Sequence, residues 1–497
     1  MRSVLAQSTT VVVLTVGLVG AGCWIPTQSR DEAATLSAVQ RSWPQLWSML
    51  ERVDIVHGLY YAAMKGWLEL VGTSTLMLRL PSVLACGLAA GLVVVLGSLL
   101  ANPRAGLLAG LVLAVAPRIT RIAVEGRSAA LFTAVAVLLV LLVVVAVRRP
   151  SIWLVPPLAL VTAVLGALHI YTLLLLPVLG LYLLYAWRPA GADGSRWERW
   201  RTALAVVWPL LGLAAGTVPV LWLALRASTQ QAQVDWIDPP SLQTLAGMAT
   251  EPFSPRNSLW AVLAWTAAAA GLVWLTRHHR RHRGTVLLLA GWLTFPGLAL
   301  ITLSATWSPL YSHRYLAFCV PPLALLAGMG LASVRRWLLS WLVATALVLS
   351  SLVTYREQRR VDAWDSWQQI MDVLAYRGQP GDVVIDYPLV SAMTVSYPDA
   401  YAGMPVINAG ANRLRQRHLW DERLPLAEVE WRLVGVQRLW YLTPVDDDVR
   451  RTSEIHRLRR LGFSGEMLER GPSEQTWLFT RSLAEAQEGD LLLRTPG

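Results

Sequence analysis

The chain has 497 residues, of which 55% are hydrophobic and 15% are charged, and its mean hydropathy is +0.45. This composition excludes an ordinary soluble multidomain protein, in which about a quarter of the residues carry a charge, and it predicts a membrane protein. The net charge of +11 comes mainly from arginines in short segments between apolar runs. That distribution is typical of orientation signals in a membrane and argues against nucleic-acid binding.

The three cysteines, Cys23, Cys86 and Cys319, lie inside or beside apolar runs and far apart in the sequence. Their spacing predicts neither a disulfide framework nor a zinc site. A cleaved lipoprotein signal ending at Cys23 is an alternative interpretation of the first apolar run. Because Gly20 stands where such signals have leucine, and many apolar runs follow, a retained first helix is favoured.

Apolar runs of about twenty residues predict membrane-spanning helices, because backbone groups in hydrocarbon must be hydrogen-bonded within their own segment. The sequence contains about eleven such runs, one of which is short. They cover residues 4–25, 80–100, 105–118, 129–147, 152–169, 171–187, 203–225, 259–276, 284–303, 315–333 and 337–354. The predicted fold class is therefore an α-helical polytopic membrane protein.

The basic residues between these runs predict the orientation of the chain. If the N-terminus is cytoplasmic, every basic cluster falls in a cytoplasmic loop, as expected for a multi-pass protein of the cell inner (plasma) membrane. These clusters are Arg104, Arg148-Arg149, Arg188 with Arg196, Arg199 and Arg201, Arg277 with Arg280, Arg281 and Arg283, and Arg335-Arg336. Segments 26–79, 226–258 and 304–314 and the tail from Tyr355 are then external.

The tail is predicted to be a separate α/β domain. Helical spacing covers Asp365 to Tyr376, and short apolar runs at 382–386, 439–442 and 476–479 indicate strands. The predicted organisation is a transmembrane domain, 1–354, with a long external loop at 26–79, and an extracytoplasmic α/β domain, 355–497. We expect the second domain to be a packing or acceptor-binding cap.

The first candidate site residues, Asp31 and Glu32, follow the first span directly. A carboxylate at a membrane-facing cleft can accept a proton from a hydroxyl group, and partial burial raises its pKa toward a useful value. The same residues also fit a helix N-terminus, in which Ser29 is the cap and Glu32 completes a capping box. Both interpretations can hold together.

The second candidate set lies later in the same loop and consists of Asp54 and His57, followed by Tyr60. An i, i+3 spacing places the carboxylate and the imidazole on one helical face, where each can orient the other. A surface pair on an amphipathic loop helix is the alternative.

The third set combines Arg118, Arg121, Glu125 and Arg127 on the side that should be poor in arginine. Guanidinium groups match phosphate oxygens, so an interfacial lipid phosphate is a natural ligand, although snorkelling toward headgroups is an alternative. The fourth set is His313-Arg314-Tyr315, which fits either a second phosphate clamp or an interfacial anchor.

In this order, the four sets resemble the motifs of C-type (GT-C) membrane glycosyltransferases, most closely the protein mannosyltransferase and aminoarabinose transferase branch in actinobacterial form. The resemblance covers roughly residues 1–350. The matching residues are Asp31-Glu32, Asp54, His57, Leu59-Tyr60-Tyr61, Arg79-Leu80-Pro81, Arg121 to Ala129 and Arg314-Tyr315. Within the motif from Arg121 to Ala129, Ile122, Val124, Gly126 and Ala129 depart from the residues that the family usually has there.

The resemblance implies an inverting glycosyltransferase that moves a sugar, with mannose favoured, from a polyprenyl-phosphate donor to an extracytoplasmic protein or cell-envelope glycan. Asp31, with Glu32 beside it, is then the general base, and Asp54, His57 and Tyr60 position the acceptor. The donor phosphate is bound by Arg121, Glu125, Arg127, His313, Arg314 and Tyr315. No cluster demands a cofactor, although an acidic pair facing phosphate can recruit a divalent cation. A transporter of lipid-linked saccharides and a non-catalytic membrane scaffold are the alternative functions.

Overall fold

The structure is a computed structural model that describes residues 2–187, 196–230, 237–277, 282–334, 337–363, 367–387, 390–399, 401, 403–445, 448–471 and 474–494. The chain forms two compact units. The first, here called the membrane unit, comprises Met1–Cys23, Asp54–Ala63 and Leu76–Gln358. The second, here called the sheet unit, comprises Trp24–Val53, Met64–Thr75 and Arg359–Gly497.

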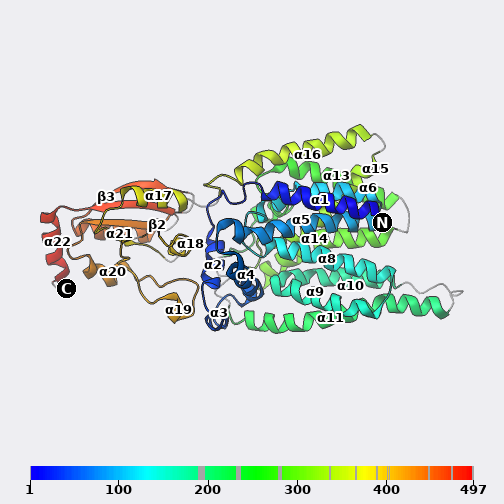
Figure 1. Ribbon diagram of the computed structural model, residues 1–497, viewed down its shortest axis with the longest axis horizontal. Coiled ribbons are helices and arrows are strands. Elements are labelled where there is room, and N and C mark those ends of the chain that lie inside the picture. Colours follow the sequence, from blue (N-terminus) through cyan, green and yellow to red (C-terminus); the bar gives the residue numbers. More distant parts are fainter. Residues whose placement is uncertain are drawn as a thin grey trace. The chain divides into compact units, whose positions relative to one another are not determined.

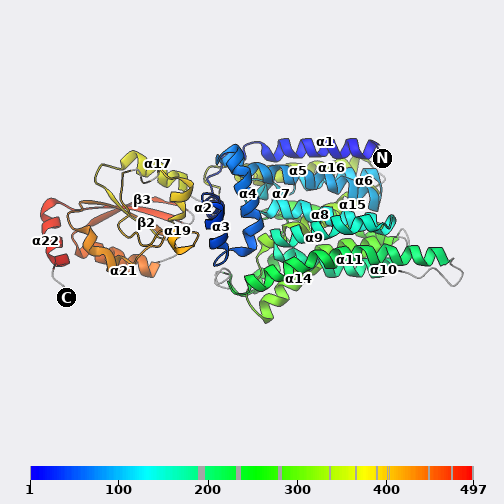
Figure 2. The ribbon, with the colours of Figure 1, turned by 60° about the horizontal axis from the view of Figure 1, so that its bottom comes forward.

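The membrane unit is a bundle of helices, which Figures 1 and 2 show side by side. Eight helical segments in the described part of the chain are long and apolar enough to cross a membrane. They are α1 (Arg2–Gly20), α5 (Thr75–Leu100), α8 (Ala129–Arg148), α11 (Arg196–Ala227), α13 (Ser258–Arg277), α14 (Arg283–Thr306), η6 with α15 (His313–Ser333), and α16 (Trp337–Glu357).

Three shorter apolar helices complete the set of predicted runs: α6 (Pro103–Ala114), α9 (Val155–Leu168) and α10 (Leu175–Ala186). Each apolar run predicted from the sequence thus corresponds to a helix, and the multi-pass prediction is confirmed. The orientation stays a prediction, and Arg188, Arg280, Arg281, Arg335 and Arg336, on which it partly depends, lie outside the described residues.

Small residues allow the helices of the bundle to approach closely. A Cβ atom added to Gly330 of α15 would lie 1.9 Å from the carbonyl oxygen of Ala267 in α13, and one added to Gly271 would lie 2.0 Å from that of Leu326. Close backbone approach gives strong van der Waals contact, on which helix association in a membrane depends because lipid is as apolar as the side chains.

The first external loop of the prediction is mainly helical. It contains α2 (Arg30–Val39), α3 (Trp43–Leu50), η1 (Ile55–His57) and α4 (Gly58–Val71). Ser29 and Ser42 cap α2 and α3, each in a complete capping box, which explains where these helices begin. The loop is divided between the units: Asp54–Ala63 groups with the membrane unit, and the flanking segments group with the sheet unit.

The sheet unit contains a four-stranded sheet of order β1-β2-β4-β3, in which β1 and β2 are parallel and the other pairs are antiparallel. The strands are β1 (Val383–Ile385), β2 (Arg438–Pro444), β3 (Ser464–Arg470) and β4 (Glu474–Thr480). The helices of the tail are α17 (Trp367–Arg377), α18 (Ala392–Ser396), α19 (Arg413–Gln416), α20 (Leu426–Val429), η7 (Glu430–Leu433), α21 (Asp448–Arg460) and α22 (Leu483–Arg494).

The core of this unit explains which strands the sequence reveals. Trp440 and Phe479 lie in the central strands and are fully buried with Trp367 of α17, so their segments have the apolar runs that predict strands. The strand β3 is an edge strand whose side chains are mostly exposed, and the sequence did not predict it. Ala33 of α2 belongs to the same core, so the helix that carries Asp31 is part of the sheet unit.

Candidate active site

A hydrogen-bonded network in the membrane unit joins the second and third candidate sets. The Tyr61 hydroxyl donates to Oδ2 of Asp54 across 2.6 Å, and Nη1 of Arg127 donates to the same hydroxyl across 3.2 Å. Nη2 of Arg127 lies 3.3 Å from Nε2 of His57. Because a guanidinium only donates, Nε2 of His57 is the acceptor in this contact.

Local backbone geometry brings these side chains together. Asp54 adopts a left-handed conformation with φ 62°, which aspartate tolerates better than most residues and which turns the chain into η1 and α4. His57 and Tyr61 are then one helical turn apart, with ring centroids separated by 5.9 Å. The amide of Ile55 donates to Oε1 of Gln230 across 3.1 Å, which fixes this turn against the end of α11.

Arg127 is held in position by the start of α5. The Ser82 hydroxyl lies 2.7 Å from the carbonyl oxygen of Glu125 and 3.3 Å from that of Arg127. Beside it, Arg79 is completely buried and donates to the carbonyl oxygen of Cys23 across 2.7 Å. The Arg79-Leu80-Pro81 segment that carried part of the family resemblance therefore anchors the first span.

Tyr61 is a neutral hydrogen-bond donor at physiological pH. Burial raises its pKa well above the ordinary value of 10.0; the Asp54 carboxylate raises it further, and the Arg127 guanidinium opposes both effects. The phenol therefore connects Asp54 to Arg127 without ionising.

The second group of site residues lies on and beside α7 (Pro117–Ile122). Nε of Arg121 lies 2.6 Å from Oε1 of Glu125 in a half-buried ion pair at i, i+4. Arg118 is buried, and its Nε donates to the carbonyl oxygen of Pro252 across 3.0 Å while an Nη donates to that of Glu251. Arg118 thus has a structural role in joining α7 to the segment that precedes α13.

Electrostatic interactions show that further arginines gather around α7. Burial lowers the pKa of Arg118 to about 10; Glu125 opposes the shift, and the charges of Arg121 and Arg314 add to it. The pKa of Arg121 is lowered by burial and also by Arg314 and Arg256, against the effect of Glu125. Like charges held together at this cost favour an anionic ligand. We call Arg118, Arg121, Arg256 and Arg314 the arginine cluster.

The fourth candidate set lies at the start of the η6–α15 segment. Arg314 is exposed, and His313 and Tyr315 are half-buried. The ring of Tyr315 lies 4.9 Å from that of His169 and 5.3 Å from that of Tyr171. Arg314 therefore belongs to the arginine cluster, whereas Tyr315 belongs to an aromatic group on the neighbouring helices.

Asp31 and Glu32 lie in the first turn of α2, in the sheet unit. Glu32 is completely buried: its Oε2 accepts from the Ser29 amide across 3.0 Å, and its own amide donates to the Ser29 hydroxyl across 3.3 Å. The predicted capping box is confirmed. Asp31 is exposed, and its role as a general base stays a prediction.

Several site residues were not singled out from the sequence. Tyr61 belongs to the Leu59-Tyr60-Tyr61 motif, of which the sequence predicts Tyr60 as the positioning residue. Tyr60 is buried, with its ring 6.2 Å from that of Tyr61. The i, i+4 spacing of His57 and Tyr61 was the available signal. No signal in the sequence points to Arg256 or His169, because their segments contain no motif of the family.

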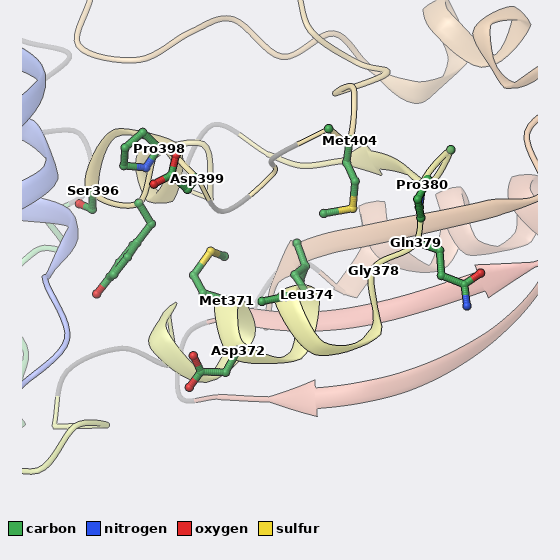
Figure 3. A pocket seen from close by; sticks show the side chains of 14 residues that line it. Met371, Asp372, Leu374, Gly378, Gln379, Pro380, Ser396, Pro398, Asp399 and Met404 are labelled. Carbon is green, nitrogen blue, oxygen red and sulfur yellow. The ribbon is translucent and has the colours of Figure 1, made fainter.

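The sheet unit has a groove of about 800 Å³ between α17 and the segment 396–404. Figure 3 shows Met371 and Leu374 of α17 and Met404 of the opposite segment projecting toward the same space. None of the predicted site residues lines it. Across the residues that the structure describes, no group of three or more His, Cys, Asp or Glu side chains is arranged to hold a metal ion.

Comparison with solved structures identifies the fold. ArnT from Cupriavidus metallidurans bound to undecaprenyl phosphate matches with a TM-score of 0.58 and 14% identity, over 98% of this chain and 99% of that one. The apo oligosaccharyltransferase of Archaeoglobus fulgidus matches with a TM-score of 0.51 and 10% identity, over 88% and 70%. The same enzyme tethered with an acceptor peptide matches with a TM-score of 0.50 and 10% identity, over 94% and 74%.

No protein-family profile and no curated protein sequence matches the chain significantly. The structural likeness at these identities establishes the architecture: the chain has the fold of the C-type membrane glycosyltransferases, with a bundle of membrane helices and a small C-terminal sheet domain. The predicted fold class is confirmed.

Proposed function

We propose that the protein is an inverting glycosyltransferase that moves a sugar from a polyprenyl-phosphate donor to a hydroxyl-bearing acceptor. The observation that carries the proposal is the arginine cluster beside the Asp54–Tyr61–Arg127–His57 network, within a C-type glycosyltransferase fold. A dense group of guanidiniums at the end of a membrane bundle suits a lipid phosphate, and the structural neighbour ArnT is bound to undecaprenyl phosphate.

In this reaction the acceptor oxygen attacks the anomeric carbon while the bond from that carbon to the phosphate oxygen breaks. The electron pair leaves with the lipid phosphate, whose negative charge increases by one, and the acceptor proton passes to a carboxylate base. Arg121, Arg127 and Arg314 stabilise the departing phosphate, because fixed positive charges act most strongly where charge develops in the transition state.

The assigned roles differ in what supports them. The phosphate-binding role of Arg121 and Arg314 is supported by their mutual electrostatic interaction, and that of Arg127 by its position in the network. Asp31 is proposed as the general base because of the family resemblance and its exposed place in the first turn of α2. Glu32, which completes the capping box, is proposed to hold that turn in place.

The sugar and the acceptor are finer proposals. The resemblance to the mannosyltransferase branch makes mannose the first donor sugar to examine, with aminoarabinose and other pentoses next. The acceptor is a protein or a cell-envelope glycan at the non-cytoplasmic face of the inner membrane.

The proposal is tested by transfer of radiolabelled sugar from undecaprenyl-phosphate mannose to a cell-envelope extract, with the purified protein in nanodiscs. Wild type is compared with Asp31→Asn, which keeps the shape of the side chain but removes its basicity. Asp362→Asn is the matched control, because Asp362 is a partly exposed aspartate of the same unit, paired with Arg360.

We expect label transfer with wild type and Asp362→Asn and none with Asp31→Asn. Wild-type turnover in Asp31→Asn would remove Asp31 as the base while leaving the enzyme class intact. If wild type transfers neither mannose nor any lipid-linked pentose, the glycosyltransferase proposal fails, and transport of lipid-linked saccharides becomes the function to examine.

A further inference from the structure

A buried histidine stands where two short apolar helices of the membrane unit meet. His169 has φ −164° and ψ 111°, an extended conformation that ends α9, and η3 (Ile170–Leu174) leads from it into α10. The Thr172 hydroxyl lies 2.7 Å from the carbonyl oxygen of His169 and 3.1 Å from that of Leu165. These hydrogen bonds satisfy carbonyl groups at the end of α9, so the turn is a defined structure.

The imidazole of His169 is enclosed by aromatic rings. It stacks on Phe132 of α8 with a centroid distance of 4.7 Å and an interplanar angle of 16°. The ring centroid of Tyr315 lies 4.9 Å from that of His169, and the centroid of Tyr171 lies 5.4 Å away in an edge-on arrangement. Three helical segments separated in the sequence thus supply rings around one polar group.

One nitrogen of this imidazole has no hydrogen-bond partner. The His169 side chain is 92% buried, since its exposed fraction is 8%, and within the described part of the chain its Nε2 atom bonds to no other group. A buried polar atom without a partner destabilises the folded protein. Residues that cost stability in this way are concentrated at functional sites, where a ligand supplies the missing partner.

His169 also adjoins the candidate active site. Its neighbour Tyr315 directly follows Arg314 of the arginine cluster, and His169 interacts electrostatically with His57 of the hydrogen-bonded network. The aromatic group therefore lies next to both the proposed phosphate-binding residues and the network.

We propose that His169, with Phe132, Tyr171 and Tyr315, forms the subsite for the sugar ring of the lipid-linked donor, in which Nε2 of His169 hydrogen-bonds a sugar hydroxyl. This inference rests on the proposed function. A hydroxyl can donate or accept, so it pairs with either tautomer of a neutral imidazole, whereas a phosphate oxygen requires a donor. Aromatic walls with one placed polar group are typical of a site for a small ring, and the guanidiniums beside them suit the phosphate.

The test measures binding of three lipids to the full-length protein in nanodiscs: undecaprenyl phosphate, undecaprenyl-phosphate mannose and undecaprenyl-phosphate aminoarabinose. His169→Phe keeps an aromatic ring of similar size and removes both nitrogens, and His169→Gln restores a hydrogen-bonding group. Arg314→Ala serves as the contrasting variant, because it removes a charge assigned to the phosphate that all three lipids share.

We expect wild type to bind at least one sugar-bearing lipid more tightly than undecaprenyl phosphate. His169→Phe should lower the affinity for that sugar-bearing lipid roughly tenfold to a hundredfold and leave the affinity for undecaprenyl phosphate unchanged. His169→Gln should recover part of the lost affinity. Arg314→Ala should lower the affinity for all three lipids by the same factor.

The sugar subsite would be overturned if His169→Phe lowered the affinity for every lipid equally, or lowered the affinity for none of them. Equal affinity of wild type for lipids with and without a sugar would also overturn it. If wild type binds none of the three lipids, the proposed function itself fails, which is a result distinct from either of these.

Discussion

The hydroxyl of Tyr61 donates a hydrogen bond of 2.6 Å to the Asp54 carboxylate, seven residues earlier in the chain. This bond closes the turn through η1, and the same hydroxyl accepts from Arg127, which comes from a distant part of the sequence. A single phenol thus joins the acidic residue at the start of η1 to a proposed phosphate-binding arginine, and a Tyr61 variant tests this connection.

Replacing Tyr61 by phenylalanine removes the hydroxyl and leaves the Asp54 carboxylate and the Arg127 guanidinium without their shared partner. We expect a loss of about tenfold in transfer rate, corresponding to roughly 1–2 kcal/mol for a buried hydrogen bond. Tyr182→Phe is the control, since Tyr182 is a half-buried tyrosine of α10 in the same unit and lies outside the candidate site. An equal loss in both variants, measured by radiolabel transfer, would contradict the role of Tyr61.

Removing Arg314 should weaken donor binding. A charge-assisted hydrogen bond to phosphate contributes about 1.5–3 kcal/mol, so Arg314→Ala should lower the affinity for undecaprenyl phosphate by roughly tenfold to a hundredfold. Arg104→Ala, at an exposed arginine at the start of α6, should leave it unchanged. The measurement is lipid binding in nanodiscs; unchanged affinity in Arg314→Ala would remove this residue from the phosphate site.

Glu32 should contribute to the stability of the protein through its capping contact and not to the transfer reaction. Glu32→Ala breaks the capping box and should lower the stability of the sheet unit by about 1 kcal/mol, whereas Glu32→Gln keeps the capping contact and should retain both stability and transfer. Thermal unfolding and radiolabel transfer of the full-length protein measure the two effects. Loss of transfer in a fully stable Glu32→Gln would show that the carboxylate of Glu32, and not only its cap, is needed.

Glu454 should make the stability of the sheet unit depend on pH. Burial raises its pKa from 4.5 to about 7, against the opposing effects of the Leu426 amide and Arg457, and its Oε2 accepts from the Tyr441 hydroxyl across 2.9 Å. The folded protein therefore binds a proton that the unfolded chain releases near pH 4.5. The resulting stabilisation is fully present below pH 4.5 and is lost as the pH rises through 7.

The comparison of wild type with Glu454→Gln isolates this effect, because glutamine is neutral at every pH. The Tm of wild type relative to this variant should be constant below pH 4.5 and fall between pH 4.5 and 7. Glu466→Gln, at an exposed residue of β3, should show no such trend. A difference between wild type and Glu454→Gln that stays flat across this range would contradict the raised pKa.

The strands β2 and β4 show why part of the sheet unit could be predicted. Both faces of β2 are buried, so Leu439 to Leu442 form an apolar run that only a buried segment has. The edge strand β3 and the arginine-rich helix α21 carry no comparable signal, because exposed segments are under little hydrophobic selection and their positions depend on partners elsewhere in the chain.

The sequence by itself determined the class of protein and the kinds of residue at its candidate site. Hydrocarbon imposes a length and an apolar composition on every span, so the membrane helices can be identified without knowledge of their neighbours. The acidic and arginine motifs likewise stand out because ionisable groups near a membrane are costly.

Only the tertiary structure decided which of these residues meet. Tyr61 contacts Arg127, and His169 contacts Phe132 and Tyr315, because segments far apart in the sequence pack against one another in the membrane unit. The helix that carries Asp31 belongs to the sheet unit, because its residue Ala33 packs in the core of that unit. Contacts between segments far apart in the chain depend on how whole helices fit together, and no local pattern of residues contains that information.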